Sequence, residues 1–511
     1  MFWITAALST ALVLWGVLFT SSFGAVTRAS FSFIVSNLSW FYMISTTLFL
    51  VFVIVLAFSR YGKIRLGKEG EEPEFGRFSW IAMMFQAGMG LALVFFGASE
   101  PLTHYADPPF GEAQPYTTGA AQLAMQYSFF HWGLHAWGVF ALVGLAVAYF
   151  NFRRDTRGLI SPIFYPILGE RVNGPIGKAI DVLSILVTLI GVAVSLGLGG
   201  LQIGAGFGEA LGFSNGLGLQ LIIISVTIVA YMLSASTPID KGVKWLSNIS
   251  FMVGAFLVVY FIAVGPAVTQ VNAFTQGIGD YLGGLIPMSF RVNSFNQDTS
   301  FLGNYTTFYW AWWVTWAPYV GVFAARISRG RTIREFVGGM LIAPSLITAA
   351  WFSIVGATAI DLDQTIGGTL SETAQSNPAI GYFAFLQYLP LPFILSLVSL
   401  FMLWIFFVAG ADAGTIVLGS MSAGGINNPS AKNKLSWGAA MAAFAAVLLL
   451  AGGLEALQQA AVLVAAPFGI VMLFMCWSLY KSLKADAREE ERQEESREAE
   501  PVAKPAPSPG K

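Results

Sequence analysis

The segment Tyr309–Arg334 has the sequence YWAWWVTWAPYVGVFAARISRGRTIR, an apolar run that holds four tryptophans within seven residues and closes with four arginines. On a helix that turns about 100° per residue, Trp312, Trp313 and Trp316 lie within an arc of roughly 100°. A single tryptophan in a membrane helix usually anchors that helix at the lipid interface. Three large π-faces on one side of a helix instead predict a wall that faces a cation.

Apolar runs of this length recur along the whole chain. Of its 511 residues, 56% are hydrophobic and only 11% are charged. A run of about 20 apolar residues is long enough to cross a bilayer. The sequence therefore predicts an all-α polytopic membrane protein with 12 transmembrane helices. The predicted spans are 3–20, 40–58, 79–98, 122–150, 181–203, 218–234, 246–268, 301–325, 336–358, 389–419, 436–453 and 459–481.

The basic residues alternate between the two sides of the predicted spans. Of the 27 lysines and arginines, 18 lie in the loops after the even-numbered spans, seven in the tail and two after odd-numbered spans. Basic residues accumulate in cytoplasmic loops. The pattern predicts that the even-numbered loops and both termini are cytoplasmic.

The spans group into two blocks of five that follow two extra helices. Residues 1–78 contain those two helices and a cytoplasmic loop, and the blocks occupy 79–269 and 301–484. The polar segment 270–300 is predicted to contain an amphipathic helix on the outer surface that connects the blocks. The Glu- and Pro-rich tail, 485–511, is predicted to be disordered, acidic and cytoplasmic.

Both blocks are predicted to open with an interrupted helix. Gly88-Met89-Gly90 lies in the middle of the third span, and Trp316-Ala317-Pro318 lies in the middle of the eighth. Because five is odd, the second block must be inverted relative to the first. Broken helices at matching places in inverted repeats mark the binding site of many transporters. The alternative is that the glycines only allow close helix packing.

The rarity of chemically reactive side chains argues against an enzyme. A single cysteine, Cys476, excludes an intrachain disulfide, and only three histidines are present, so neither a metal centre nor a cofactor is expected. His131 and His135 are one helical turn apart and could bind a metal as a pair, but no carboxylate or third ligand is expected nearby. We expect them to form hydrogen bonds between helices.

The fourth span supplies a second set of aromatic residues. On a continuous helix, Trp132, Trp137 and Phe140 share one arc, whereas the two histidines lie on the opposite side. Together with Trp313 these rings would form a box, with Trp312 and Trp316 along the path. Such a box suits a trimethylammonium group, which has a diffuse charge and no N–H to donate. Free backbone N–H groups between Gly88 and Ala92 would then bind the carboxylate of a zwitterion.

Several motifs resemble the betaine/choline/carnitine transporter (BCCT) family over nearly the whole chain. They are AGMGLALVFFGASEP (87–101), YSFFHWGLHAW (127–137), RVNGPIGKAID (171–181), SLGLGGLQIG (195–204) and the segment quoted first, extended to Phe336. This resemblance implies two inverted five-helix repeats (LeuT-like), a homotrimer, a bacterial inner-membrane location and an onium substrate such as glycine betaine, carnitine or choline. By motif match, the box positions are Trp132, Trp137, Phe140 and Trp313, with Trp312, Trp316, Gly88, Met89, Gly90 and Ala92 as further substrate-binding candidates.

The sequence departs from the sodium-coupled members of that family. Their hydroxyl ligands are expected in the fifth and tenth spans. Thr188 remains in the fifth span, but Ala409 and Gly410 stand where threonine and serine are expected. Sodium is a hard cation that needs several oxygen ligands. Transport is therefore predicted to be sodium-independent, by exchange or proton coupling, with a sodium-coupled betaine or choline symporter as the alternative.

Two buried acids and the tail complete the predictions. Asp412, the acid deepest within a span, is a candidate for coupling, although it is more simply a carboxylate held by hydrogen bonds. Glu100 is expected to cap or brace an outer gate. The short acidic tail predicts no strong osmotic activation. A channel or receptor for onium compounds is the alternative of another class, and no nucleic-acid partner is expected.

Overall fold

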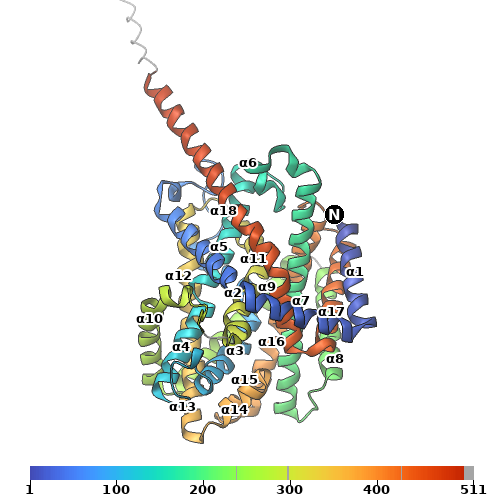
Figure 1. The fold of residues 1–511 in the computed structure, drawn as a ribbon, viewed down its shortest axis with the longest axis vertical. Helices are drawn as coiled ribbons and strands as arrows, with labels where there is room; N and C mark the ends of the chain where they lie inside the picture. The colour runs from blue at the N-terminus through green and yellow to red at the C-terminus, as the bar shows by residue number, and fades with distance from the viewer. Residues whose placement is uncertain (237–238, 296–297, 427, 500–511) are drawn as a thin grey trace, which may run out of the picture.

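The computed structural model describes residues 1–236, 239–295, 298–426 and 428–499. The described residues form helices joined by loops, and their one β-bridge pairs Arg65 with Thr332 (Figure 1). The longer helices are α1 (Phe2–Leu18), α2 (Thr20–Phe58), α3 (Arg77–Ala106), α4 (Thr118–Trp132), α5 (Leu134–Ala148), α7 (Pro175–Leu211), α8 (Leu217–Ser236), α9 (Ile239–Val264), α10 (Ala267–Ser289), α11 (Thr307–Arg326), α12 (Ile333–Trp351), α13 (Ala357–Ile366), α14 (Thr369–Ser376), α15 (Pro378–Gln387), α16 (Pro392–Ser422), α17 (Ala431–Gly452) and α18 (Leu454–Ala499).

The predicted all-α membrane fold agrees with these elements. Within the described residues, seven helices are by themselves long and apolar enough to cross a bilayer, or up to nine if two bent pairs each count as one span. A helix or helix pair occupies each of the twelve predicted ranges. The number twelve and the inverted repeats remain predictions. One boundary differs: α2 begins at Thr20, so the expected loop before residue 40 is helical.

The first helix of each predicted repeat was expected to be interrupted, but only the one in the first repeat is bent. In α3, the segments Arg77–Phe85 and Gly90–Gly111 meet at 65°, as expected for a broken helix. The expected interruption of the eighth span does not occur, because α11 is one continuous helix through Pro318. Neighbouring groups can satisfy the carbonyl that a proline leaves free, so a membrane helix can contain one without breaking.

The predicted fourth span is broken at Gly133. This residue has φ −94° and ψ −136°, and it separates α4 from α5. The phenol of Tyr281 in α10 accepts a hydrogen bond from the freed Leu134 N–H at 2.9 Å. A Cβ at position 133 would lie 2.5 Å from the Phe129 carbonyl oxygen, so only glycine fits. The prediction that Trp132, Trp137 and Phe140 lie on one continuous helix was therefore wrong.

Glycines bring α11 close to the helices around it. A Cβ on Gly321 would lie 2.8 Å from the Val143 side chain and 2.9 Å from the Gly144 nitrogen in α5. A Cβ on Gly191 in α7 would lie 2.8 Å from the Thr315 hydroxyl. Small residues allow this approach between membrane helices. As a result, α11 lies between α5 and α7, where its tryptophans meet both.

The end of the molecule that carries α6 (Tyr165–Leu168) gathers the predicted cytoplasmic loops, and α13 and α14 lie at the opposite end (Figure 1). Arg331 stacks on the Trp80 ring at 4.0 Å and donates to the Phe75 carbonyl oxygen at 2.6 Å. Arg334 donates to the Ala57 carbonyl oxygen at 2.9 Å. These contacts of Arg331 and Arg334 brace the loop after α2.

Two connecting segments complete the fold. The amphipathic segment forms α10, which meets the preceding helical segment Met252–Val264 at 110°. The tail was predicted to be disordered from residue 485, but α18 continues as a helix to Ala499 and projects away from the bundle (Figure 1). The long α18 begins in the bundle, so its C-terminal part extends an already formed helix. Residues 500–511 lie outside the described part of the chain.

Candidate functional site

The four residues predicted to form the aromatic box lie in one chain of ring contacts. Trp132 of α4 meets Trp313 of α11 with centroids 5.1 Å apart, and Trp313 meets Phe140 of α5 at 5.9 Å. Phe140 in turn meets Trp137 at 5.6 Å. Each pair is edge-to-face, with interplanar angles of 70°, 82° and 88°. All four side chains are fully buried. The rings therefore converge as predicted and pack directly on one another.

The two further tryptophans of α11 extend this cluster. Trp312 stacks on Trp313 at 5.0 Å and 13°, and it is fully buried. Trp316 is partly exposed and lies edge-on to Trp312 at 5.8 Å. Its indole N–H donates to the Gly191 carbonyl oxygen in α7 at 3.1 Å. The aromatic surface thus runs from α4 and α5 along α11 to α7.

The glycine motif lies only partly within the described side chains. Side chains at positions 86–89 are outside that part, so the roles predicted for Gly88 and Met89 remain untested. A Cβ on Gly90 would lie 2.9 Å from the Phe406 ring in α16. Ala92 is buried, with 1% of its surface exposed. The bend of α3 therefore lies against α16, where both helices approach closely.

A buried carboxylate lies directly behind the box. Glu100 of α3 accepts hydrogen bonds from the Trp132 indole N–H at 2.7 Å and from the Tyr309 hydroxyl at 2.6 Å. Its other oxygen lies 2.7 Å from His131 Nδ1. Glu100 therefore connects α3, α4 and α11 at the box itself. The expected bracing role fits these contacts, but the sequence did not indicate that its partners would be the box residues.

Both histidines of the paired motif join helices, as predicted. Nε2 of His131 lies 3.0 Å from the Thr306 hydroxyl in η6 (Leu302–Thr306). Nε2 of His135 lies 3.0 Å from the Ser289 hydroxyl at the end of α10. The expectation that no carboxylate lies near them was wrong, because the fold brings Glu100 to His131 from a different helix.

Among the described residues, Glu100, His104 and His131 place potential metal-ligand atoms within 4.8 Å of one another. Trp132 and Tyr309 already donate to the second oxygen of Glu100, and Thr306 contacts the second nitrogen of His131. These contacts are those of a hydrogen-bonded carboxylate, and we assign no metal to the group.

Two of the positions where sodium ligands are expected, Ala409 and Gly410, carry no hydroxyl. The Thr188 hydroxyl donates to the Ser184 carbonyl oxygen at 2.8 Å, within its own helix. Ala409 and Gly410 of α16 are partly exposed, and a Cβ on Gly410 would meet open space. Asp412, one turn further along α16, is 5% exposed. Its role in coupling remains a prediction.

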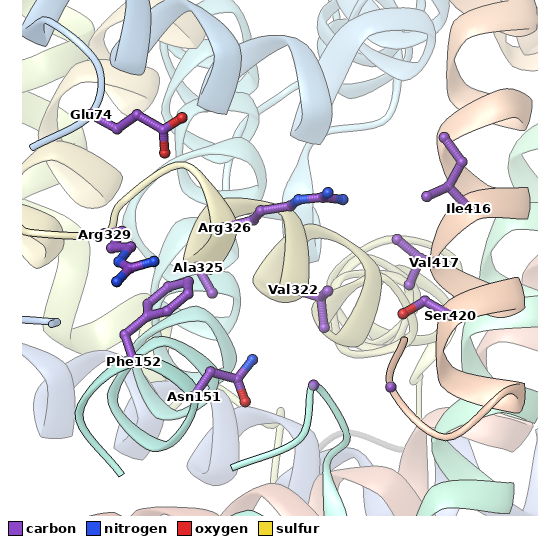
Figure 2. A pocket seen from close by; sticks show the side chains of 12 residues that line it. Glu74, Asn151, Phe152, Val322, Ala325, Arg326, Arg329, Ile416, Val417 and Ser420 are labelled. Carbon is purple, nitrogen blue, oxygen red and sulfur yellow. The ribbon is translucent and has the colours of Figure 1, made fainter. Parts of the chain in front are cut away.

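A cavity of about 200 Å³ opens at the end of α11 that carries the arginines. Val322 and Arg326 of α11, Ile416 and Ser420 of α16, and Phe152 after α5 line it (Figure 2). Arg329, at its rim, lies 2.5 Å from Glu71. The hydrogen bond from the Lys68 backbone N–H, and after it the Arg329 guanidinium, hold the pKa of the Glu71 carboxyl below its usual range. The cavity lies among loops predicted to be cytoplasmic.

Comparison with known proteins places the chain in a family. A model described as "BCCT, betaine/carnitine/choline family transporter" matches residues 1–488. The chain belongs to this family. It is therefore a multi-pass membrane transporter and not an enzyme.

Individual BCCT relatives are similar over most of the chain. The glycine betaine transporter OpuD of Bacillus subtilis is 46% identical over 490 residues, which cover 96% of this chain and 95% of the relative. An ectoine/hydroxyectoine transporter of Virgibacillus pantothenticus is 40% identical, over 94% of this chain and 96% of its own. An osmo-dependent choline transporter of Acinetobacter baylyi is 37% identical, over 95% and 71%.

Proposed function

We propose that this BCCT transporter carries a small zwitterion with an alkylated onium head, with glycine betaine as the first candidate. The observation that carries the proposal is the ring chain Trp132–Trp313–Phe140–Trp137, which unites residues from three helices. Each face-on contact with a desolvated onium head contributes roughly 0.5–2 kcal/mol. The names of the relatives share parts of this chemistry: glycine betaine is an onium zwitterion, choline has the same onium head, and ectoine is a zwitterion.

The rings are in mutual contact, so binding requires them to separate. The partly exposed Trp316 lies between the box and Val322, which lines the cavity in the same helix. We propose that this cavity is the cytoplasmic end of the pathway and that substrate leaves along α11 and α16. Arg326 at the end of α11 and Arg329 in the following loop line it, which supports the cytoplasmic assignment by the positive-inside rule. Both termini then lie in the cytoplasm of a bacterial cell.

Coupling is proposed to be sodium-independent, by exchange or with protons. Ala409 and Gly410 offer no side-chain oxygen to a sodium ion. Backbone carbonyls alone are a poor shell for a hard cation. The alternative is a sodium-coupled betaine or choline symporter. A homotrimer is proposed from the family resemblance alone.

Uptake by purified protein in proteoliposomes tests the proposal. Labelled glycine betaine, carnitine and choline should be supplied outside the vesicles under three conditions. The driving force is a sodium gradient in the first, a proton gradient in the second, and unlabelled substrate inside the vesicles in the third. We expect betaine uptake without sodium, and strict sodium dependence would overturn the coupling proposal. Trp313→Ala should lower betaine affinity by about 2- to 30-fold, the loss of one cation–π contact. Unchanged affinity would contradict the role of the box.

A further inference from the structure

Glu100 lies one indole away from the proposed position of the onium head. Its side chain is fully buried. One oxygen accepts from Trp132 and Tyr309, and the other contacts His131. Trp132 therefore takes part in both groups: its ring packs in the box, and its indole N–H donates to the Glu100 carboxylate.

The surroundings of Glu100 are those of an ionised carboxylate. An indole N–H can only donate, so the oxygen that it meets must accept, and several donors around one carboxylate favour the charged form. If His131 donates from Nδ1, its Nε2 accepts from the Thr306 hydroxyl, and a neutral imidazole satisfies both contacts. The remaining titratable neighbours are His104, with Nε2 at 3.4 Å from the carboxylate, and Tyr305, whose ring lies 4.6 Å from the His104 ring.

We infer that Glu100 is a positioning residue that, through Trp132, makes the box prefer a positively charged head over a neutral group of the same shape. A buried negative charge acts over several ångströms because the surrounding dielectric is low. A hydrogen bond to an ionised acceptor also polarises its donor, which makes the indole face more attractive to a cation. This inference rests on the proposed function of the same box.

A purely structural role makes a different prediction. In that case Glu100 would only hold α3, α4 and α11 together, and its loss would weaken every ligand that fits the box to the same extent. A charge effect instead weakens cationic heads selectively. The quantity that separates the two roles is the ratio of two affinities.

The experiment compares glycine betaine with tert-butylacetate, in which carbon replaces the ammonium nitrogen, as competitors of labelled betaine uptake in proteoliposomes. Glu100→Gln and Glu100→Met both remove the charge, and only one of them needs to reach the membrane. We expect either variant to reduce the preference for betaine over tert-butylacetate by about tenfold, the effect of one charge at several ångströms in a protein interior. Glu100→Asp, which keeps the charge, should retain more of the preference for betaine than Glu100→Gln or Glu100→Met.

Thr306→Val is the matched control. It removes the hydroxyl at the far end of the same hydrogen-bond chain and leaves the carboxylate in place. It should shift the affinities for both competitors equally. An equal shift in the Glu100→Gln and Glu100→Met variants would overturn the inference while leaving the box proposal intact. Failure of the box itself is seen separately, as unchanged betaine affinity in Trp313→Ala.

Discussion

At the scale of single residues, the box owes its position to residues that the ligand would never touch. Gly133 ends α4 immediately after Trp132, so α5 presents Trp137 and Phe140 from a new direction. Glu100 then fixes the orientation of the Trp132 ring by accepting a hydrogen bond from its indole N–H. The aromatic character of the site is local in sequence, but its geometry depends on a glycine break and on a carboxylate from another helix.

The missing hydroxyls of α16 lead to a residue-scale prediction. A Cβ on Gly410 meets open space, so the double variant Ala409→Thr/Gly410→Ser should fold normally. Val192 is buried one helical turn after Thr188 in α7. Because threonine and valine have nearly the same shape, adding Val192→Thr places a third new hydroxyl beside Thr188. We expect sodium to stimulate betaine uptake by this triple variant and not by the unmodified protein. The measurement is the initial rate of uptake at increasing sodium concentration, with potassium replacing sodium so that the total cation concentration is constant and no choline is present. A lack of stimulation would mean that hydroxyls alone do not decide coupling.

At the scale of helices, α11 is held by close contacts along both sides. Gly321 meets α5, and Thr315 lies against Gly191 of α7. These contacts flank Trp316 and follow shortly after Trp312 and Trp313, so the tryptophans cannot shift independently of the helix. The sequence predicted which faces of α11 carry aromatics because that depends only on helical periodicity. It did not predict that Pro318 leaves α11 unbroken, or that His131 meets Glu100. Those features depend on the depth and rotation of one helix against another, which residues far apart in sequence determine.

Gly321→Ala tests this packing. The added methyl would lie 2.8 Å from Val143 and 2.9 Å from the backbone of Gly144, so α11 must move away from α5. Overpacking of this kind typically costs about 1–3 kcal/mol. We expect a lower melting temperature in detergent and weaker betaine binding. Gly410→Ala is the matched control, since its methyl meets open space and should leave the melting temperature unchanged. Equal melting temperatures for both variants would contradict the tight contact.

At the scale of the whole molecule, the C-terminal helix connects the bundle to loops that are predicted to be cytoplasmic. Asp486 of α18 is 7% exposed and forms ion pairs with Arg153 and Arg154 after α5, and its carboxylate accepts from the Tyr149 hydroxyl at 2.5 Å. A cleft of about 320 Å³ beside this cluster also includes Lys68 of the loop after α2. Composition predicted an acidic tail without structure from residue 485. Asp486, the first acid of that tail, is instead part of the folded protein. Composition could not predict this, because its two arginine partners lie more than 300 residues earlier in the chain.

This placement divides the tail into two parts with different expected effects. Removal of residues 490–511 takes away only chain beyond the Asp486 cluster, so uptake should remain within about twofold of the full-length protein at low and high osmolality, a change of less than 0.5 kcal/mol in the barrier. Removal of residues 486–511 also leaves Arg153 and Arg154 without their buried partner, and Asp486→Asn does so in the full-length chain. Loss of the Asp486 carboxylate removes both ion pairs and the hydrogen bond from Tyr149. Both changes should therefore lower the melting temperature. If the shorter deletion alone abolished activation at high osmolality, the distal tail would be the osmotic sensor and the prediction would be wrong.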